Sequence, residues 1–238
     1  MKYEAVIFDL FGTLINKLSL REHTGLLRQM ASIVSVPSDD FVRLWFGTFN
    51  ERGLGVFQSL ESNIEYICQQ LGVRPEDTKV TLAAQINLDY TARSIKPRTD
   101  AAEVLSYLKS RGYKIGLISN CSTSIPNILN NMPFAQMIDV ALFSSLVGMQ
   151  KPDPRIYQLV AKQLALKPED CLYIGDGDEH ELTGAAQAGM HPVLICDPCE
   201  GGTDVYRVNS EAEQWHGPVI SSLTEVLKLV SGEYTPII

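Results

Sequence analysis

The sequence predicts an α/β fold, a doubly wound parallel sheet that carries an inserted block of helices. Short apolar runs of about four residues alternate with helical patterns along most of the chain. Continuous hydrophobicity of this kind is typical of strands buried on both faces of a parallel sheet. The strand–helix–strand repetition indicates helices on both faces of that sheet. Between Ile15 and about Lys96, by contrast, every pattern is helical.

The strands and helices of the sheet region follow one another in regular order. A clear helix spans 99–112, where Asp100 and Glu103 have capping-box spacing and Gly112 is placed to end the helix. The segments 153–166 and 181–190 have the same helical pattern. The predicted strands are Ala5–Phe8, Ile115–Ile118, Val140–Phe143, Leu172–Ile174, Pro192–Ile195 and Pro218–Ile220.

The inserted helices form a separate predicted unit. Ser38 and Ser62 are expected N-caps within it, and Gly72 is an expected C-cap. Roughly 80 helical residues placed directly after the first strand predict a cap over the sheet edge. We therefore predict a core domain of residues 1–15 and 97–238, with a helical cap domain of residues 16–96.

Charge and cysteine content limit the classes of partner and location. The formal net charge of −8 gives no general attraction for nucleic acid or anionic lipid. No stretch reaches the roughly 18 apolar residues of a membrane span. Five scattered cysteines favour free thiols in the cytoplasm. Cys196 and Cys199 would need His191 and His216 to complete a zinc site, and chance spacing is the favoured explanation. We expect a small-molecule substrate and a monomer or homodimer.

Polar residues follow the predicted strands at the positions where ligands bind in open α/β sheets. Asp9 ends the first strand, Ser119 the second and Asp176 the fourth, while Lys151 and Glu181 follow shortly after strands three and four. Phosphoryl transfer uses such a set, because a carboxylate can attack phosphorus and form an acyl-phosphate. Carboxylates favour Mg²⁺, and Lys151 and Ser119 would hold phosphate oxygens.

Four motifs, in order and over residues 4 to about 195, resemble those of the haloacid dehalogenase-like (HAD) hydrolase superfamily: "FDLFGTL", "LISN", "GMQKPDPRIY" and "YIGDGDEHELTGAAQAGM". The resemblance implies a Rossmann-like core with strand order 5-4-1-2-3 and a C1-type helical cap. It also implies that Asp9 is the nucleophile, with Ser119 and Lys151 in the catalytic set and Asn120 beside the substrate. The implied Mg²⁺ ligands are Asp9, the Phe11 carbonyl and Asp176, supported by Thr13 and Glu181.

Phe11 departs from the family pattern. Phosphatases of the family carry an aspartate there, which protonates the leaving alcohol and then activates water. Such acid–base help contributes about 10²–10⁴-fold. We expect a phosphatase with altered acid–base groups, and His180 or Asp178 could supply the base.

Three alternatives stay open at this point. The first is a 2-haloacid dehalogenase, which needs no second acid. The fourth motif of such enzymes usually contains Ser-Asn, whereas this chain has Gly-Asp. Arg43 or Arg52 would also have to replace the arginine that these enzymes carry in the cap, near Trp45. A phosphonatase type would need a Schiff-base lysine, and none of the cap lysines lies in an evident apolar pocket. A catalytically weak domain could instead bind a phosphorylated metabolite. The cap lysines are Lys17, Lys79 and Lys96, and the expected cap contacts to substrate are Arg21, Arg43, Arg52 and Tyr90.

Overall fold

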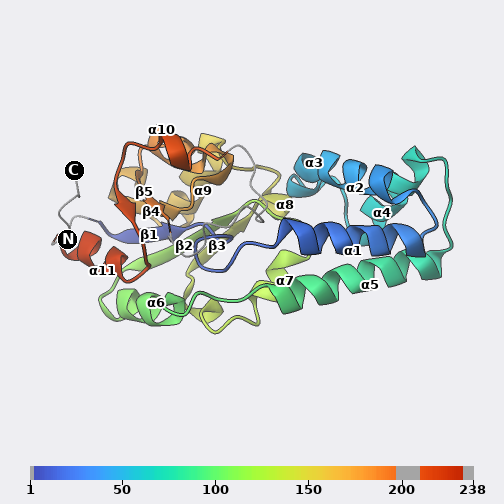
Figure 1. Ribbon diagram of the computed structural model, residues 1–238. Helices are drawn as coiled ribbons and strands as arrows, with labels where there is room; N and C mark the ends of the chain where they lie inside the picture. Colours follow the sequence, from blue (N-terminus) through green and yellow to red (C-terminus); the bar gives the residue numbers. More distant parts are fainter. Residues whose placement is uncertain (1–2, 197–209, 233–238) are drawn as a thin grey trace.

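A six-stranded parallel sheet forms the centre of the protein in a computed structural model, which describes residues 3–196 and 210–232 (Figure 1). The strand order is β3-β2-β1-β4-β5-β6, which confirms the expected 5-4-1-2-3 order and adds β6 at the edge beside β5. The strands are β1 Ala5–Phe8, β2 Lys114–Ser119, β3 Val140–Phe143, β4 Cys171–Gly175, β5 His191–Ile195 and β6 Val219–Ile220.

The central strand β1 is buried on both faces, as its apolar sequence predicts. Val6 and Phe8 pack into the core on one side of the sheet, while Ala5 and Ile7 pack into the core on the other. Phe8 pairs with Leu117 of β2 on one flank of β1, and with β4 on the other. The chain beyond β1 therefore emerges between the ends of β2 and β4, where polar residues were expected to meet.

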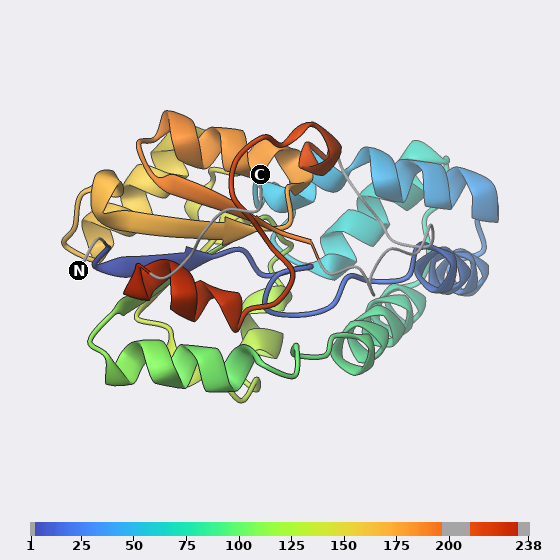
Figure 2. The same ribbon diagram turned by 60° about the vertical axis from the view of Figure 1, so that its left-hand side comes forward.

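Helices cover both faces of the sheet (Figures 1 and 2). The pair α6 and α11 covers one face, and the pair α9 and α10 covers the other. Short helices α7 and α8 follow β2 and β3, near the edge where the strands end. The bounds are α6 Ala101–Ser110, α7 Ile125–Leu129, α8 Ser144–Val147, α9 Pro154–Gln163, α10 Glu181–Gln187 and α11 Glu225–Ser231, with one-turn 3₁₀ helices at Ala135–Met137, Pro168–Asp170, Asp178–His180 and Ala212–Gln214.

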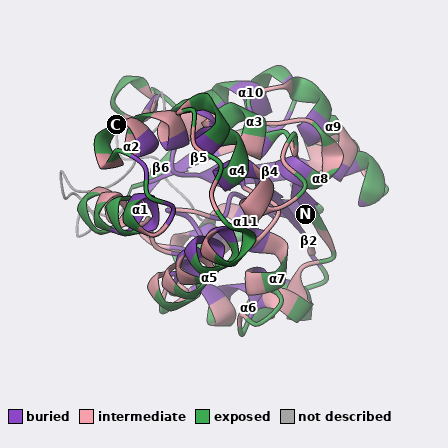
Figure 3. Ribbon diagram, turned by 90° about the vertical axis from the view of Figure 1, so that its right-hand side faces the viewer, coloured by how far each residue is buried: buried purple, intermediate pink, exposed green. Residues whose placement is uncertain are grey.

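The segment between β1 and α6 is helical, and it has an apolar core of its own around Phe41 and Trp45. Figure 3 shows these helices with their buried faces turned inward. The two connections to the sheet region run side by side, since Asn16 N donates to Lys96 O at 3.0 Å. The domain limits at 15/16 and 96/97 stay predictions. The helices are α1 Leu20–Ile33, α2 Ser38–Gly47, α3 Phe49–Gly53, α4 Leu60–Gln70 and α5 Asp77–Ser94. Among the described residues, none of the helices is long and apolar enough to cross a membrane.

Two expected N-caps in this helical segment are wrong by one or a few residues. Ser38 is the first residue of α2, whose N-cap is Pro37 without a side-chain bond. Helix α4 begins earlier than expected, and its N-cap is Ser59. Ser62 is instead the reciprocal partner of Ser59 in a capping box, because both hydroxyls bond the opposite backbone amide.

The expected capping box of α6 is also wrong. Asp100 is the N-cap residue, but its side chain makes no capping hydrogen bond. Its Oδ2 accepts a hydrogen bond from the backbone amide of Thr224 at 3.3 Å instead. Gly72 and Gly112 both have the left-handed conformation that favours glycine just past a helix end.

Candidate active site

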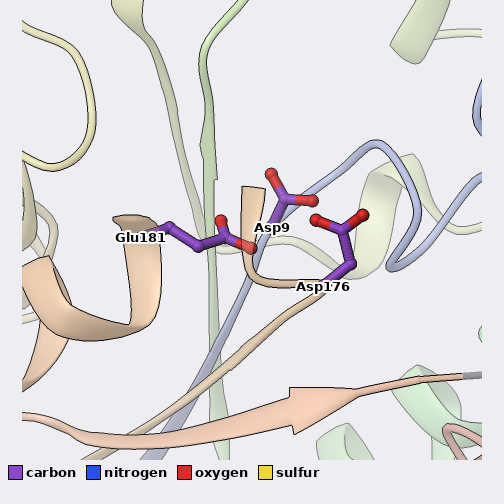
Figure 4. A group of neighbouring side chains, drawn as sticks. All are labelled: Asp9, Asp176 and Glu181. Atoms are coloured by element: carbon purple, nitrogen blue, oxygen red, sulfur yellow. The ribbon is translucent and has the colours of Figure 1, made fainter. Parts of the chain in front are cut away.

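Asp9 lies at the carboxyl end of β1 with its side chain buried (Figure 4). Its Oδ1 accepts a hydrogen bond from Lys151 Nζ at 2.5 Å. Its Oδ2 is buried without a hydrogen bond among the described residues. Burial raises the pKa of Asp9 above its usual value, while the Lys151 ammonium opposes that change. One oxygen of Asp9 is therefore held by Lys151, while the other has no partner among these residues that would compete with a reacting group or a cation.

Lys151 is held by two carboxylates. Its ammonium also donates to Glu181 Oε2 at 2.5 Å, and its side chain is 3% exposed. Burial alone would lower the pKa of Lys151, but the carboxylates of Asp9 and Glu181 outweigh it and hold the pKa well above the usual value. Lys151 therefore stays protonated beside Asp9.

Glu181 has both carboxylate oxygens engaged. Oε1 accepts from Gly177 N at 3.0 Å, and Oε2 accepts from Tyr173 Oη at 2.7 Å as well as from Lys151. A second tyrosine, Tyr157, donates to the Glu181 backbone carbonyl at 2.8 Å. These bonds fix Glu181 as the residue that positions Lys151, while its expected support of a Mg²⁺ site stays a prediction.

An acidic cluster lies at this edge of the sheet. Carboxylate oxygens of Asp9, Asp176 and Glu181 lie within 4.8 Å of one another. Figure 4 shows these side chains converging from β1, from the loop after β4 and from the start of α10. The oxygens of Glu181 are engaged in this way, whereas within the described residues Asp9 keeps one unbonded oxygen and Asp176 lies outside the Lys151 network.

Lys17 is a member of the site that the sequence did not predict. Its ammonium contacts Asp176 Oδ2 and lies 3.0 Å from Asp178 Oδ2. Burial would lower the pKa of Lys17, but the two aspartates outweigh it and raise the pKa. A lysine kept protonated in this way is a poor nucleophile, so Lys17 does not suit the Schiff-base role of a phosphonatase.

Ser119 and Asn120 end β2 beside this cluster. Ser119 is buried, and its hydroxyl makes no hydrogen bond within the described residues. Asn120 fixes the loop around Lys151, since its Oδ1 accepts from Lys151 N at 2.8 Å and its Nδ2 donates to Lys151 O at 3.0 Å. Thr13, which follows Asp9 closely in the sequence, is also buried, and its hydroxyl makes no hydrogen bond within the described residues.

Glu179 is the second residue that the sequence analysis missed. Its Oε2 accepts from Asn120 Nδ2 at 2.6 Å, and it lines the cavity that also contains Asp9 and Lys151. Burial raises the pKa of Glu179 to about 7, in spite of Lys151 and Asn120. The two expected base residues are placed differently, since Asp178 binds Lys17 and His180 is exposed and does not line the cavity.

A cavity of about 200 Å³ lies between the sheet edge and the inserted helices. Phe11 lines it and also packs against the core of the sheet. The wall from the inserted helices includes Trp45 and Arg52, and the guanidinium carbon of Arg52 lies 4.5 Å from the Trp45 ring centroid. The lining residues from this side, mostly aromatic or apolar, are Leu18, His23, Trp45, Phe46, Phe49, Arg52, Gly53, Asn87 and Thr91.

Of the four expected cap contacts, Arg52 alone lines the cavity. Arg43 of α2 pairs with Asp40 at 3.0 Å, and its side chain is 67% exposed. Arg21 is exposed, and Tyr90 stacks on His23, which itself lines the cavity. These three side chains do not line the cavity, so the expected contacts with substrate have no support from the structure.

Comparison with known proteins identifies the family. The sequence profile of the haloacid dehalogenase-like hydrolases matches residues 3–189. A phosphatase of Mycobacterium tuberculosis is 30% identical over 82% of this chain and 88% of its own length. A glyceraldehyde 3-phosphate phosphatase of Methanopyrus kandleri is 25% identical over 81% and 83% of the two chains. A solved 2-haloacid dehalogenase of Pseudomonas syringae has a TM-score of 0.72 at 16% identity, covering 98% of this chain and 100% of the other.

The fold and the charged site at the end of β1 define a hydrolase built on a doubly wound sheet. The chain belongs to the haloacid dehalogenase-like hydrolase family.

Proposed function

We propose that the protein hydrolyses a small phosphate monoester, with Asp9 as the nucleophile. The observation that carries the proposal is the state of the Asp9 carboxylate. Lys151 holds Oδ1, while the buried Oδ2 has no hydrogen bond among the described residues, and Asp9 lines a cavity together with Asp176 and Lys17. The relatives that are named as phosphatases support phosphorus as the electrophile.

Two chemical steps follow from this arrangement. An oxygen of the Asp9 carboxylate forms a bond to phosphorus while the bond from phosphorus to the ester oxygen breaks, and the leaving oxygen takes a proton. Water, losing a proton to a base, then attacks the acyl-phosphate, which releases phosphate and restores the Asp9 carboxylate. Lys151 Nζ and the Ser119 hydroxyl are placed to stabilise charge on the phosphoryl oxygens.

Mg²⁺ fits the donor groups at this edge of the sheet. Asp9 and Asp176 offer carboxylate oxygens, and the Phe11 carbonyl is the third protein ligand in our proposal. Oδ2 of Asp9 is the buried, unbonded oxygen that such a cation would satisfy. A bound Mg²⁺ would offset the repulsion between the carboxylates and an anionic substrate.

Glu179 takes the role that Phe11 cannot fill. In the proposal, its protonated carboxyl gives the proton to the leaving oxygen, and its carboxylate then accepts a proton from water. Its place in the cavity beside Asn120 and its pKa of about 7 support both roles at neutral pH. Its backbone also has a left-handed φ of 58°, a strained conformation of the kind that clusters at functional sites.

A second candidate function is hydrolysis of a 2-haloacid. Here Asp9 would displace halide from carbon and form an ester, a step that requires no acid at position 11. The observation in favour is Arg52, which reaches the cavity beside Trp45 and could bind the substrate carboxylate. The Gly-Asp sequence before Glu181 counts against this alternative.

A parallel screen separates the functions. Phosphate esters and 2-haloacids are each incubated with the purified protein, in Mg²⁺ and in EDTA, and phosphate and halide release are measured. We expect phosphate release that requires Mg²⁺, is absent in Asp9→Asn and is unchanged in Asp77→Asn, a change of an exposed aspartate. Halide release that is insensitive to EDTA would favour the dehalogenase. Ligand-induced thermal shifts without turnover would favour a binding protein.

The size of the cavity and the net charge of the chain favour a small substrate. A cavity of about 200 Å³ suits a small metabolite rather than a macromolecule. The acidic net charge of −8 disfavours nucleic acid as a partner. We place the enzyme in the cytoplasm, as a monomer or homodimer.

A further inference from the structure

The ammonium of Lys17 contacts Asp176, a carboxylate that would hold Mg²⁺ in the proposed function. Lys17 belongs to the connection between β1 and α1, and its side chain is only 8% exposed. It contacts Asp176 Oδ2 directly and Asp178 Oδ2 at 3.0 Å. Asp176 is one of the two carboxylates of the acidic cluster that the Lys151 network leaves available.

The turn after β1 leaves room for the Lys17 side chain. Gly12 has a left-handed φ of 82°, and a Cβ placed there would overlap both the Asp176 carboxylate and the Lys17 Cε. Arg98 fixes the same turn, because its Nη2 donates to the Gly12 carbonyl at 3.0 Å. Glycine at this position therefore leaves the space in which Lys17 and Asp176 meet.

The connection that carries Lys17 is tied to the one that returns from the inserted helices. The Asn16 side chain donates to Ser94 O at 3.1 Å and to Lys17 O at 2.9 Å. Its Oδ1 accepts from Lys96 N at 2.6 Å. The position of Lys17 is thus set by the paired connections.

We propose that Lys17 is a built-in counter-ion that competes with Mg²⁺ for Asp176, so that Mg²⁺ binds only when the Lys17 ammonium moves away. The inference rests on the Mg²⁺ site of the proposed function. A Mg²⁺ ion on Asp176 and the Lys17 ammonium would repel each other, so each cation weakens the binding of the other. Removal of the Lys17 charge therefore strengthens Mg²⁺ binding.

Calorimetric titration of MgCl₂ into the metal-free protein tests this competition. Lys17→Met keeps most of the aliphatic side chain and removes the charge. We expect its Kd for Mg²⁺ to be about tenfold or more below that of the unmodified protein, equivalent to about 1.4 kcal/mol. Lys17→Arg, which keeps the charge, and Lys96→Met, at an exposed position in the returning connection, should bind Mg²⁺ like the unmodified protein.

Thermal unfolding gives a second readout that does not depend on turnover. Without metal, Lys17→Met leaves Asp176 and Asp178 without their counter-ion, so it should unfold at a lower temperature. Mg²⁺ should then raise its Tm by more than it raises that of the unmodified protein. Equal or weaker Mg²⁺ binding by Lys17→Met, or no binding by either protein, overturns the inference.

The outcome for Lys17 is separable from that of the proposed function. Equal Mg²⁺ affinities together with Mg²⁺-dependent phosphate release would overturn the competition and leave the phosphatase intact. Tighter Mg²⁺ binding by Lys17→Met without turnover of any phosphate ester would support the competition and contradict the phosphatase.

Discussion

Glu179→Gln tests how the protein works with Phe11 in place of an acid. The substitution removes the titratable proton and keeps an oxygen that can accept the hydrogen bond from Asn120. A carboxyl with a pKa of about 7 is half protonated at pH 7, whereas one with the ordinary pKa of 4.5 would be protonated in only about 0.3% of molecules. Burial of Glu179 thus raises the fraction of protonated carboxyl at pH 7 by about 150-fold.

The expected loss follows from the role of that proton. General acid–base catalysis is worth about 10²–10⁴-fold, so kcat/KM for an alkyl phosphate should fall by this factor in Glu179→Gln. The loss should be smaller for p-nitrophenyl phosphate, whose leaving group needs no proton. With the alkyl ester, kcat/KM of the unmodified enzyme should fall as the pH rises through about 7, because Glu179 loses its proton. The Glu179→Gln variant should not show this decrease.

The assay is phosphate release with both esters between pH 5.5 and 8.5 at saturating Mg²⁺. Glu169→Gln, a change of an exposed glutamate, is the matched control and should behave like the unmodified enzyme. Rates within about threefold of the unmodified enzyme on both esters, with the same pH profile, would refute the role of Glu179.

Two further predictions concern Phe11 and His23. Adding Phe11→Asp to Glu179→Gln should raise the rate of alkyl phosphate hydrolysis at least tenfold, because an acid then occupies the position that it has in phosphatases of the family. No gain in the steady-state rate would show that an acid at position 11 cannot replace Glu179. Burial and, second, the Arg52 charge lower the pKa of His23 to about 4. Between pH 4 and about 6.5, His23 is therefore protonated in the unfolded chain but neutral in the folded one. The free energy of unfolding should fall as the pH drops through this range, by at most about 3 kcal/mol. Urea unfolding at pH 4.5 and 7.5 should show a smaller difference for His23→Gln, and an equal difference would contradict the assigned pKa.

The sheet was predictable because its strands are apolar on both faces. The run at Ala5–Phe8 is buried throughout, as expected for an inner strand, and its pairing with β2 and β4 places Asp9 between the ends of these two strands. Helix starts were less predictable, because several nearby serines compete for one cap, as Ser59 and Ser62 show.

The residues that complete the candidate site were harder to predict. Lys17 and Asp178 are separated by 161 positions, and nothing in the local pattern links them. Glu179 is one of several acids in a polar loop, and its entry into the cavity depends on a left-handed backbone that sequence does not reveal. Arg43 and Arg52 both lie near Trp45 in sequence, and three-dimensional packing alone separates the exposed one from the one at the cavity.

Trapping the covalent intermediate tests the role of Asp9 most directly. The protein is mixed with a phosphate ester and Mg²⁺, quenched, and reduced with borohydride, which converts an aspartyl phosphate to homoserine. Tryptic cleavage after Lys2 and Lys17 gives a peptide in which Asp9 and Glu4 are the only acids. We predict homoserine at position 9, and no conversion in Asp9→Asn. Turnover of the ester without any modification of this peptide would contradict nucleophilic attack by Asp9.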